Sequence, residues 1–250
     1  MAENRGGTPR SRTPGTLEYG GWMRAAEEEY RRIDVLLAGL DDEQWQRPTD
    51  CDGWQVRDVV AHLAGAAAGT ASVPELLRQA WHGRRRGGDG DLVDRMNAVQ
   101  VAERQHLSPA ELRADLAESS RRGLRARRRL PAPARAVRLP FGPPLGIRPL
   151  GYLMGRIYTR DAWMHRVDLA RATGVPLTLT PDHDGVLVED LVAEWATTHD
   201  EPFLLEVTGP AGGSFRRGNT TSLTVDAVDL ARTLSGRATG AGLLAHTVPF

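Results

Sequence analysis

The sequence contains no lysine: all 32 of its basic residues are arginine. Without a lysine amine the chain cannot form a Schiff base, which excludes imine-forming aldolases and pyridoxal-phosphate enzymes. The usual phosphate-binding loop is excluded too, because that motif needs a lysine beside the phosphates. The codon preference of a high-GC genome explains the absence most simply, and arginine remains the better side chain for gripping carboxylates.

Cysteine is almost as scarce, since Cys51 is the only one. The chain can therefore form neither an internal disulfide nor a multi-cysteine zinc or iron–sulfur site. This predicts a cytoplasmic protein in which any zinc site draws on histidine, aspartate and glutamate. Cys51 itself is interpreted as a structural residue outside the helix face that follows it.

Long apolar segments and a charge imbalance are also missing. Residues 1–16 lack the apolar segment of a signal peptide and are predicted to form a disordered tail. No apolar run reaches the roughly 18 residues of a membrane span. The formal net charge of zero argues against a general attraction to nucleic acid or to a membrane.

Apolar residues recur at three- and four-residue steps in four long segments, near 17–40, 55–71, 108–130 and 150–173. A capping box with proline at the first helical position, Ser108 to Glu111, begins the third segment. Gly174 ends the fourth. Four long helices are typical of a four-helix bundle, which we expect over residues 17–175.

The segments between these helices carry breaking residues. Residues 41–53 and the polar, glycine-rich stretch 82–90 are predicted to be connections, with helical structure around 92–101. Residues 131–149 contain six prolines and cannot form a regular helix. This segment either covers a cleft or merely crosses from one helix to the next.

The pattern changes after Gly174. We expect a helix over 184–198, a hairpin that turns at 209–213, a short helix over 228–234 and a last strand over 243–250. The predicted fold class is therefore mainly α with a small α+β domain: a four-helix bundle, followed over residues 176–250 by a compact C-terminal α/β unit.

Two of the seven histidines, His62 and His165, lie inside the long apolar helices. Asp161 precedes His165 by four residues, so the two share one helix face. Facing helices of a bundle can bring His62 to them, which would give two histidines, one carboxylate and an open position, the ligand count of a catalytic zinc site. Iron or nickel also accepts this set. The alternative is that each histidine is a hydrogen-bonded core residue.

Two further aspartates lie on or near the same faces. Asp58 precedes His62 by four residues and Asp168 follows His165 by three. We expect them to orient the imidazoles. The alternative is that they form surface ion pairs with neighbouring arginines.

Two helical motifs carry a family resemblance. Asp52 to Gly65, DGWQVRDVVAHLAG, resembles the signature of the mycothiol-dependent maleylpyruvate isomerase family, within the DinB-like metal-binding superfamily. Arg160 to Gly174, RDAWMHRVDLARATG, resembles the second motif of that family. The C-terminal segments EVTGPAGGSFRRG and DLARTLSGRATGAGLLAHTVPF resemble its sterol-carrier-like domain. The resemblance covers residues 17–250.

The resemblance implies a DinB-like bundle that binds zinc, or another divalent metal, through His62, Asp161 and His165. The acidic ligand of the best-known family pattern is glutamate, whereas Asp161 is shorter by one methylene group, which leaves the metal and its occupancy open. The resemblance also implies mycothiol as a thiol cosubstrate. A free thiol has a pKa of about 8.5 and is mostly protonated at pH 7, but a coordinating metal deprotonates it. The zinc-bound thiolate is expected to add to an electrophilic small molecule, as in an isomerase or an S-transferase.

Several other residues are candidates for binding the substrate or the thiol. The resemblance points to Arg237 as a catalytic arginine contributed by the C-terminal domain, and arginine is the natural partner of a carboxylate. Arg166, Arg217, Trp54 and Asn97 are further candidates for lining the pocket. The alternative for each is an ordinary surface, core or capping role.

Other functions remain open. A non-catalytic metal-binding or regulatory protein would keep the bundle without the reaction, and a thiol-independent hydrolase would use zinc-bound water. The arginine-rich stretch 121–138 could attract an anionic partner, but charges at a helix end are usually solvated, so no nucleic acid is expected. The expected partners are mycothiol and a small electrophile, with no membrane, and the chain is expected to be a monomer or a homodimer.

Overall fold

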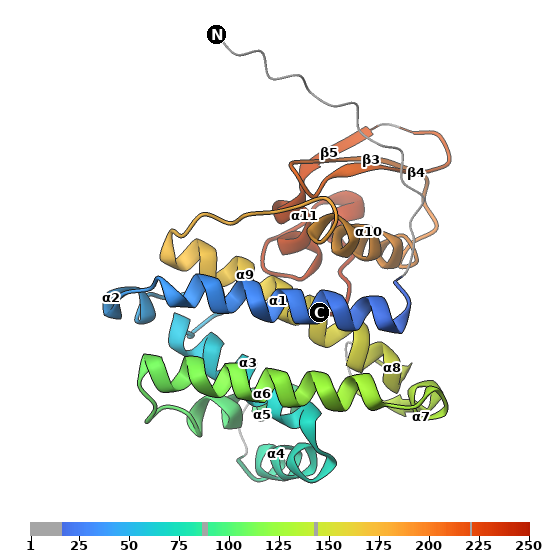
Figure 1. Cartoon of the computed structure of the whole chain (residues 1–250). Helices are drawn as coiled ribbons and strands as arrows, with labels where there is room; N and C mark the ends of the chain where they lie inside the picture. The colour runs from blue at the N-terminus through green and yellow to red at the C-terminus, as the bar shows by residue number, and fades with distance from the viewer. Residues whose placement is uncertain (1–16, 87–89, 143–144, 221) are drawn as a thin grey trace. The chain divides into compact units, whose positions relative to one another are not determined.

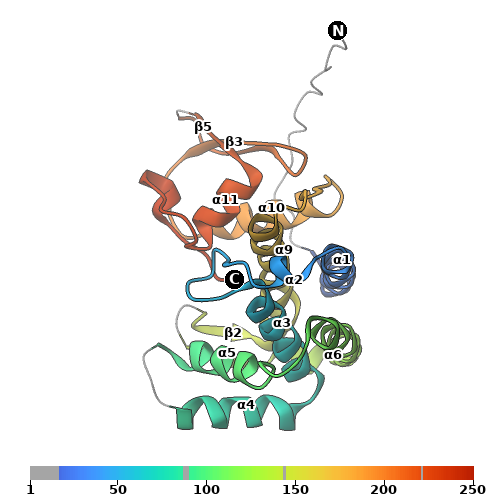
Figure 2. The same cartoon turned by 90° about the vertical axis from the view of Figure 1, so that its left-hand side faces the viewer.

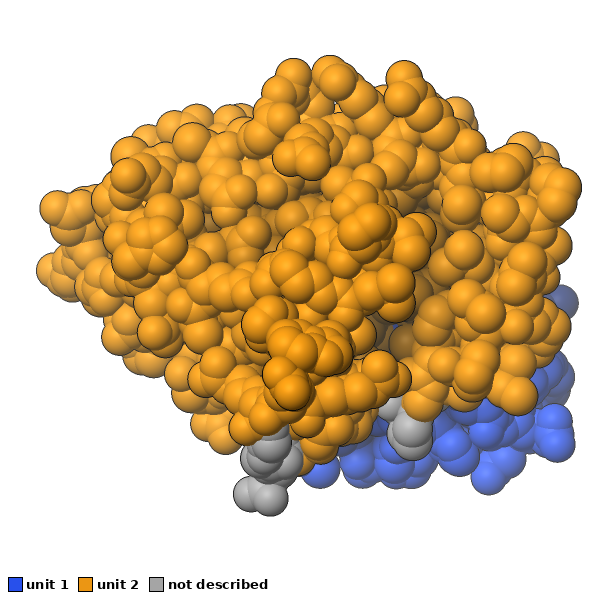
Figure 3. Space-filling view, turned by 90° about the horizontal axis from the view of Figure 1, so that it is seen from below, with its two compact units in different colours: residues 1–17, 178–249 blue, residues 18–177, 250 orange. Residues whose placement is uncertain are grey.

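The structure is a computed structural model that describes residues 17–86, 90–142, 145–220 and 222–250. The predicted tail, residues 1–16, lies outside the described residues, as do small parts of the glycine-rich, proline-rich and hairpin segments. The chain divides into two compact units, one of residues 18–177 with Phe250 and one that contains residues 178–249 (Figure 3). The prediction of a mainly α fold with a small α+β part is confirmed.

The helical unit contains most of the helix in the described part of the chain (Figure 1). Its elements are α1 (Tyr19–Ala38), α2 (Asp42–Trp45), α3 (Val56–Ala71), α4 (Val73–Arg86), α5 (Leu92–Ala102), α6 (Pro109–Arg129), α7 (Ala132–Ala136), β1 (Arg138–Pro140), β2 (Ile147–Pro149), α8 (Leu150–Tyr152), a π-helical turn (Leu153–Ile157) and α9 (Tyr158–Thr173).

The four long helices α1, α3, α6 and α9 pack on one another (Figure 2). Their inward faces form an apolar core that includes Ile33, Val60, Leu63, Leu112 and Leu169. Gly123 lets α6 approach α3 closely, because a Cβ there would lie 2.6 Å from the carbonyl oxygen of Ala67. The capping box predicted at Ser108 and Glu111 is present at the start of α6. The core therefore holds α3 and α9, which carry the candidate ligands, in contact.

Helices α4 and α5 pack on α3 and on each other (Figure 2). The sequence predicted a break over 82–90, but α4 continues to Arg86. Gly83 is buried, and a Cβ on it would lie 3.2 Å from Cγ of Met96 on α5. This glycine therefore permits a close helix contact rather than ending a helix. Residues 41–53 also differ from a plain connection, because Asp41 caps the short helix α2.

The proline-rich segment 131–149 is not irregular throughout. It contains the five-residue helix α7, and β1 pairs with β2 in an antiparallel hairpin with Arg138 opposite Pro149. Pro140 and Pro149 occupy strand ends of this exposed two-stranded sheet, where proline costs little hydrogen bonding.

The C-terminal unit combines a three-stranded sheet with two helices. Its elements are α10 (Asp184–Trp195), β3 (Phe203–Thr208), β4 (Gly213–Arg217), β5 (Ser222–Asp226), α11 (Ala227–Leu234) and a 3₁₀ turn (Gly242–Ala245). The strand order is β4-β3-β5, in which β3 and β4 form the expected antiparallel hairpin and β5 runs parallel to β3.

The prediction of a last strand over residues 243–250 is wrong. The segment begins inside the 3₁₀ turn, and the Val248 amide donates to the carbonyl of Leu234 at the end of α11, not to a strand. Within the part of the chain that is described, no helix combines the length and the apolar character that a membrane span requires.

Candidate metal centre

His62 lies in the middle of α3, and its place follows from how that helix begins. Gln55 is the N-cap, and its backbone amide donates to the carboxylate of Asp58 at 3.0 Å, as part of a capping box. His62 follows one turn later and is almost completely buried. Its Nε2 atom lies 3.5 Å from Oδ2 of Asp161.

Asp161 and His165 lie one turn apart on α9. Nε2 of His165 is 3.3 Å from Oδ1 of Asp161, so the carboxylate faces both imidazoles, one with each oxygen. The two imidazole centroids are 5.0 Å apart. The three residues proposed as ligands therefore meet at one place, and their ligand atoms lie within 4.8 Å of one another.

The donor atoms fit a divalent metal ion. Nδ1 of His165 faces the carboxylate of Asp168, so a metal that takes the lone pair of Nε2 leaves Nδ1 with its proton and a hydrogen bond to Asp168. Nε2 and the carboxylate of Asp161 are then two acceptors that oppose each other, and a cation between them removes the repulsion. In a tetrahedral zinc site, with ligands about 2.1 Å from the metal, neighbouring ligand atoms are about 3.4 Å apart. The Nε2–oxygen separations of 3.3 and 3.5 Å, each to a different oxygen of Asp161, are of the same size as this spacing.

Charges within the cluster also favour a bound cation. Burial by itself raises the pKa of Asp161, but the two histidines beside it outweigh burial and lower that pKa well below its ordinary value. Burial by itself lowers the pKa of His165, but the carboxylates of Asp161 and Asp168 raise it well above its ordinary value. A proton therefore binds tightly where a metal would compete for the same electron pairs.

One side of the cluster is open. The side chain of Asp161 is 23% exposed, whereas the side chains of His62 and His165 are each 6% exposed. The partly exposed ring of Trp54 lies beside both histidines, with centroid distances of 5.2 Å to His62 and 6.3 Å to His165. Trp54 thus forms an apolar wall next to the ligands, and the open side can admit a further ligand.

His165 has two neighbours behind the ring. Asp168 is completely buried, with Oδ2 3.1 Å from Nδ1 of His165, where the sequence placed it. Sγ of Cys51 lies 3.3 Å from the same carboxylate oxygen and 3.7 Å from Nδ1. Cys51, which the sequence predicts to be a structural residue, precedes α3 by several residues and meets α9 only in three dimensions.

His62 is oriented by a different residue from the one predicted. Asp58 is engaged in the capping box of α3, and the partner of Nδ1 of His62 is Oε1 of Gln100, at 2.9 Å. Gln100 belongs to α5, so spacing along α3 could not indicate it. A buried glutamine at the end of an otherwise apolar helical stretch is the one signal that the sequence offered.

Two predicted arginines have structural partners. The buried guanidinium of Arg166 donates to the carboxylate of Glu29 at 2.7 and 3.1 Å, which links α9 to α1. Arg217, in the C-terminal unit, donates to three backbone carbonyls, those of residues 196, 199 and 201. These contacts give both guanidiniums a role in the fold, and their roles in binding substrate or thiol stay predictions.

The last two predicted residues lie in separate units. Asn97 is half-buried on α5. Arg237 follows α11, and its backbone nitrogen donates to the carbonyl of Arg232 at 2.8 Å. Their roles in binding stay predictions.

A buried group near Asp161 was not indicated by the sequence. Arg127, within a run of arginines that resembled a solvated helix end, is buried and donates to the carbonyl of Met154 at 2.5 Å and to Thr159 Oγ1 at 3.2 Å. Met154 belongs to the π-helical turn before α9, a distortion that is frequent at functional sites. Burial, with a smaller contribution from Asp161, raises the pKa of Tyr30 and of Tyr158 to about 12.

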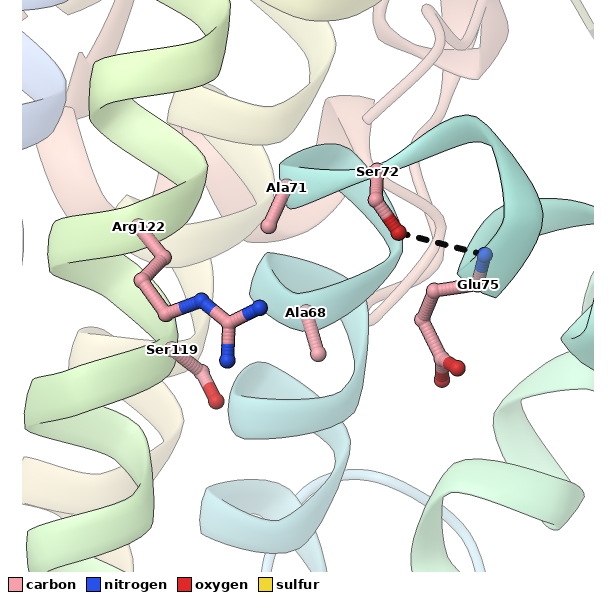
Figure 4. A pocket seen from close by; sticks show the side chains of 6 residues that line it. All are labelled: Ala68, Ala71, Ser72, Glu75, Ser119 and Arg122. Atoms are coloured by element: carbon pink, nitrogen blue, oxygen red, sulfur yellow. Dashed lines mark hydrogen bonds between the residues drawn. The ribbon is translucent and has the colours of Figure 1, made fainter.

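A small cavity of about 220 Å³ lies apart from these ligands (Figure 4). It is lined by Ala68, Ala71, Ser72, Glu75, Ser119 and Arg122. The Glu75 amide donates to Ser72 Oγ at 3.3 Å, the bond drawn in Figure 4. The candidate ligands His62, Asp161 and His165 do not line this cavity.

Known proteins of similar sequence include two relatives from Mycobacterium tuberculosis, strains CDC 1551 / Oshkosh and ATCC 25618 / H37Rv, both described as uncharacterised. Each is 28% identical over 210 residues, which cover 78% of this chain and 75% of the relative. Similar solved structures include the mycothiol-dependent maleylpyruvate isomerase and a histidine-to-alanine mutant of it. Each has a TM-score of 0.60 and 17% identity over 89% of this chain and 91% of its own.

At 17% identity these structures establish the fold. The sequence model of the mycothiol maleylpyruvate isomerase N-terminal domain matches residues 26–170, a range that contains His62, Asp161 and His165. This range is more than half of the 250 residues. The chain therefore belongs to the mycothiol maleylpyruvate isomerase N-terminal domain family.

Proposed function

We propose that this protein is a metal-dependent enzyme that uses mycothiol to act on an electrophilic small molecule, as an isomerase or an S-transferase. One observation carries the proposal: His62 of α3 and the pair Asp161 and His165 of α9 converge at ligand distances with one side open. Membership of a family named for a mycothiol isomerase supports the choice of thiol.

His62, Asp161 and His165 would hold the metal, with zinc as the first candidate. When bound, the metal supplies a charge that lowers the pKa of a thiol, so that the sulfur is a thiolate at pH 7. The side chain of Asp161 is shorter than that of glutamate. Because α3 and α9 are in contact, each of its two oxygens still lies near the Nε2 atom of one histidine. The aspartate therefore suits this set.

The surrounding residues would prepare the ligands and the substrate. Asp168 and Gln100 hold the Nδ1 sides of the imidazoles, so that both Nε2 atoms face Asp161. Trp54 shields the cluster from water and offers an apolar surface to the carbon skeleton of a substrate. Arg237 is proposed to bind a carboxylate of the substrate.

The thiol chemistry separates the two reaction types. Addition of the sulfur to an activated double bond forms a carbon–sulfur bond and leaves a single bond that can rotate, while the neighbouring carbon takes up a proton. Loss of that proton and departure of the thiol then return an isomer. If the adduct leaves instead, the enzyme is an S-transferase.

The proposal is tested by metal analysis together with thiol consumption. The purified protein is expected to carry about one zinc ion per chain. His62→Ala and His165→Ala should lose it, whereas His106→Ala, at an exposed position of the same unit, should not. Incubation with mycothiol and a panel of activated alkenes and epoxides should give an isomer or an S-conjugate.

Each contrary result points elsewhere. A chain that binds no metal contradicts the proposal. A bound metal without thiol chemistry favours a non-catalytic role, and turnover that needs no thiol favours a hydrolase.

A further inference from the structure

A chain of buried amide groups connects α4, α5 and α3 and ends at the ring of His62. We propose that Gln79 and Gln100 position His62 by fixing its proton on Nδ1, so that the lone pair of Nε2 is directed at Asp161. The inference rests on the proposed role of His62 as a metal ligand. Gln79 and Gln100 would act through His62 and are positioning residues.

The donor-to-acceptor direction of this chain of hydrogen bonds is set at Gln79, the member farther from His62. Nε2 of Gln79 lies 2.9 Å from the carbonyl oxygen of Gly65 and 2.9 Å from Oε1 of Glu75. A backbone carbonyl and a carboxylate can only accept hydrogen bonds. Both amide hydrogens of Gln79 are therefore used, and its own carbonyl oxygen must face the other way.

The remaining steps follow from that orientation. Oε1 of Gln79 lies 2.9 Å from Nε2 of Gln100, so Gln100 is the donor in this contact. Its oxygen then faces Nδ1 of His62 at 2.9 Å and accepts a proton from the ring. This acceptor, 2.9 Å from Nδ1, favours the tautomer with the proton on Nδ1 over the one with the proton on Nε2, which lies farther from its own acceptor, Asp161, at 3.5 Å. The acceptors around Gln79 thus set the orientation of both amides.

The hydrogen-bonded amides are buried, and the carboxylate of Glu75 fixes the orientation of the first of them, Gln79. Gln79 is 1% exposed and Gln100 is 4% exposed, so water does not compete for their hydrogen bonds. Hydrogen bonds from Arg78 lower the pKa of Glu75, which keeps that carboxylate an acceptor. Glu75 also lines the small cavity of Figure 4, so the chain of amides runs from that wall to His62.

Helix α3 has glycine at the two positions that face Gln79 and Gln100. A Cβ on Gly65 would lie 2.5 Å from Cβ of Gln100, closer than real contacts allow, and a Cβ on Gly69 would lie 3.1 Å from Oε1 of Gln79. Gly65 therefore serves twice, since its missing side chain admits Gln100 and its carbonyl orients Gln79.

The tautomer is read directly by long-range proton–nitrogen NMR of the imidazoles in the metal-free protein, recorded over a range of pH. The His62 signals are identified by their loss in His62→Ala. The expected pattern has a protonated Nδ1 and an unprotonated Nε2. The opposite tautomer, or an equal mixture, overturns the proposal. This measurement uses the unaltered chain and stands even if the protein binds no metal.

A second measurement removes the acceptor. Gln100→Leu should lose the single tautomer and bind zinc roughly 10- to 100-fold more weakly by calorimetry. Gln79→Leu, which frees the Gln100 amide to turn, should change both readouts in the same direction. The matched control Gln105→Leu, at an exposed position, should change neither. Unchanged tautomer and affinity in folded Gln100→Leu contradict the proposal, and if that variant does not fold, the tautomer of the unaltered chain decides.

Discussion

His165 uses its two nitrogens for different purposes. Nδ1 faces Asp168, and Nε2 faces Asp161, the residue whose charge most raises the pKa of the ring against the effect of burial. In the metal-free protein a proton therefore occupies the atom that a metal needs. This makes the cluster a place where protons and metal ions compete.

The first prediction concerns this competition. Below the raised pKa of His165, zinc must displace a proton, so zinc affinity should rise with pH and level off once the ring is neutral. Calorimetry in two buffers of different ionisation enthalpy should show proton release on binding. An affinity that does not change between acid and neutral pH, without proton release, would contradict the assignment of Nε2 as a ligand atom.

The residues of the cluster differ in how far sequence could predict them. Asp161 and His165 share a helix face by their spacing, and His62 sits within an apolar stretch, so all three were accessible to pattern analysis. Cys51 and Gln100 were not. They reach the histidines from a loop and from another helix, and such contacts depend on packing that local periodicity does not contain.

At the scale of elements, α1 and α9 are joined by the buried pair of Glu29 and Arg166. We expect Glu29→Gln to lower the free energy of unfolding by about 3–5 kcal/mol, because it removes one carboxylate from a buried ion pair. Urea denaturation measures the change. Glu28→Gln removes the same charge one residue earlier, from partly exposed pairs with Arg31 and Arg32, and should cost much less because solvent screens these pairs. Equal effects in the two variants would contradict the role given to the buried pair.

Helices α3 and α6 depend on close backbone approach. In Gly123→Ala the new Cβ would lie 2.5 Å from Thr70 Oγ1, so the helices must separate, and we expect a loss of about 1–3 kcal/mol in denaturant unfolding. Gly20→Ala is the matched control, since its Cβ meets only the end of the Arg24 side chain, at 3.7 Å. That change should stabilise α1 by up to about 1 kcal/mol. A stabilising Gly123→Ala would show that α6 does not need the contact.

The helix ends differ in how well the sequence predicts them. Capping at Ser108 and the αL glycine at Gly174 gave reliable helix ends, because both act within one turn. The glycine-rich stretch 82–90 was predicted to be a connection, but Gly83 lies inside α4, where it contacts Met96 of another helix. Glycine serves as a breaker or as a contact surface, and only the packing partner distinguishes the two.

At the scale of the whole molecule, the balanced charge hides how differently the arginines are used. Of the 32 arginines, 15 lie between Arg104 and Arg171. The sequence treated the run that ends α6 as solvated, yet Arg127 is buried and donates to carbonyls of the π-helical turn. Composition sets the number of guanidiniums, but whether each one holds the fold or remains available for a substrate depends on the carbonyls and carboxylates that the fold brings to it.

Arg237 is the predicted arginine for which a catalytic role remains proposed, and it belongs to a different unit from the metal ligands. If it binds a substrate carboxylate, Arg237→Ala should leave the zinc content unchanged and lower kcat/KM roughly 10- to 100-fold, the loss expected for one charge-assisted hydrogen bond of about 1.5–3 kcal/mol. Arg216→Ala, at an exposed position of β4 in the same unit, should keep full activity. Steady-state kinetics with zinc analysis of both variants decides the matter. An equal loss in the two variants would contradict a specific role for Arg237, whereas a loss confined to Arg237 would support its proposed role in catalysis.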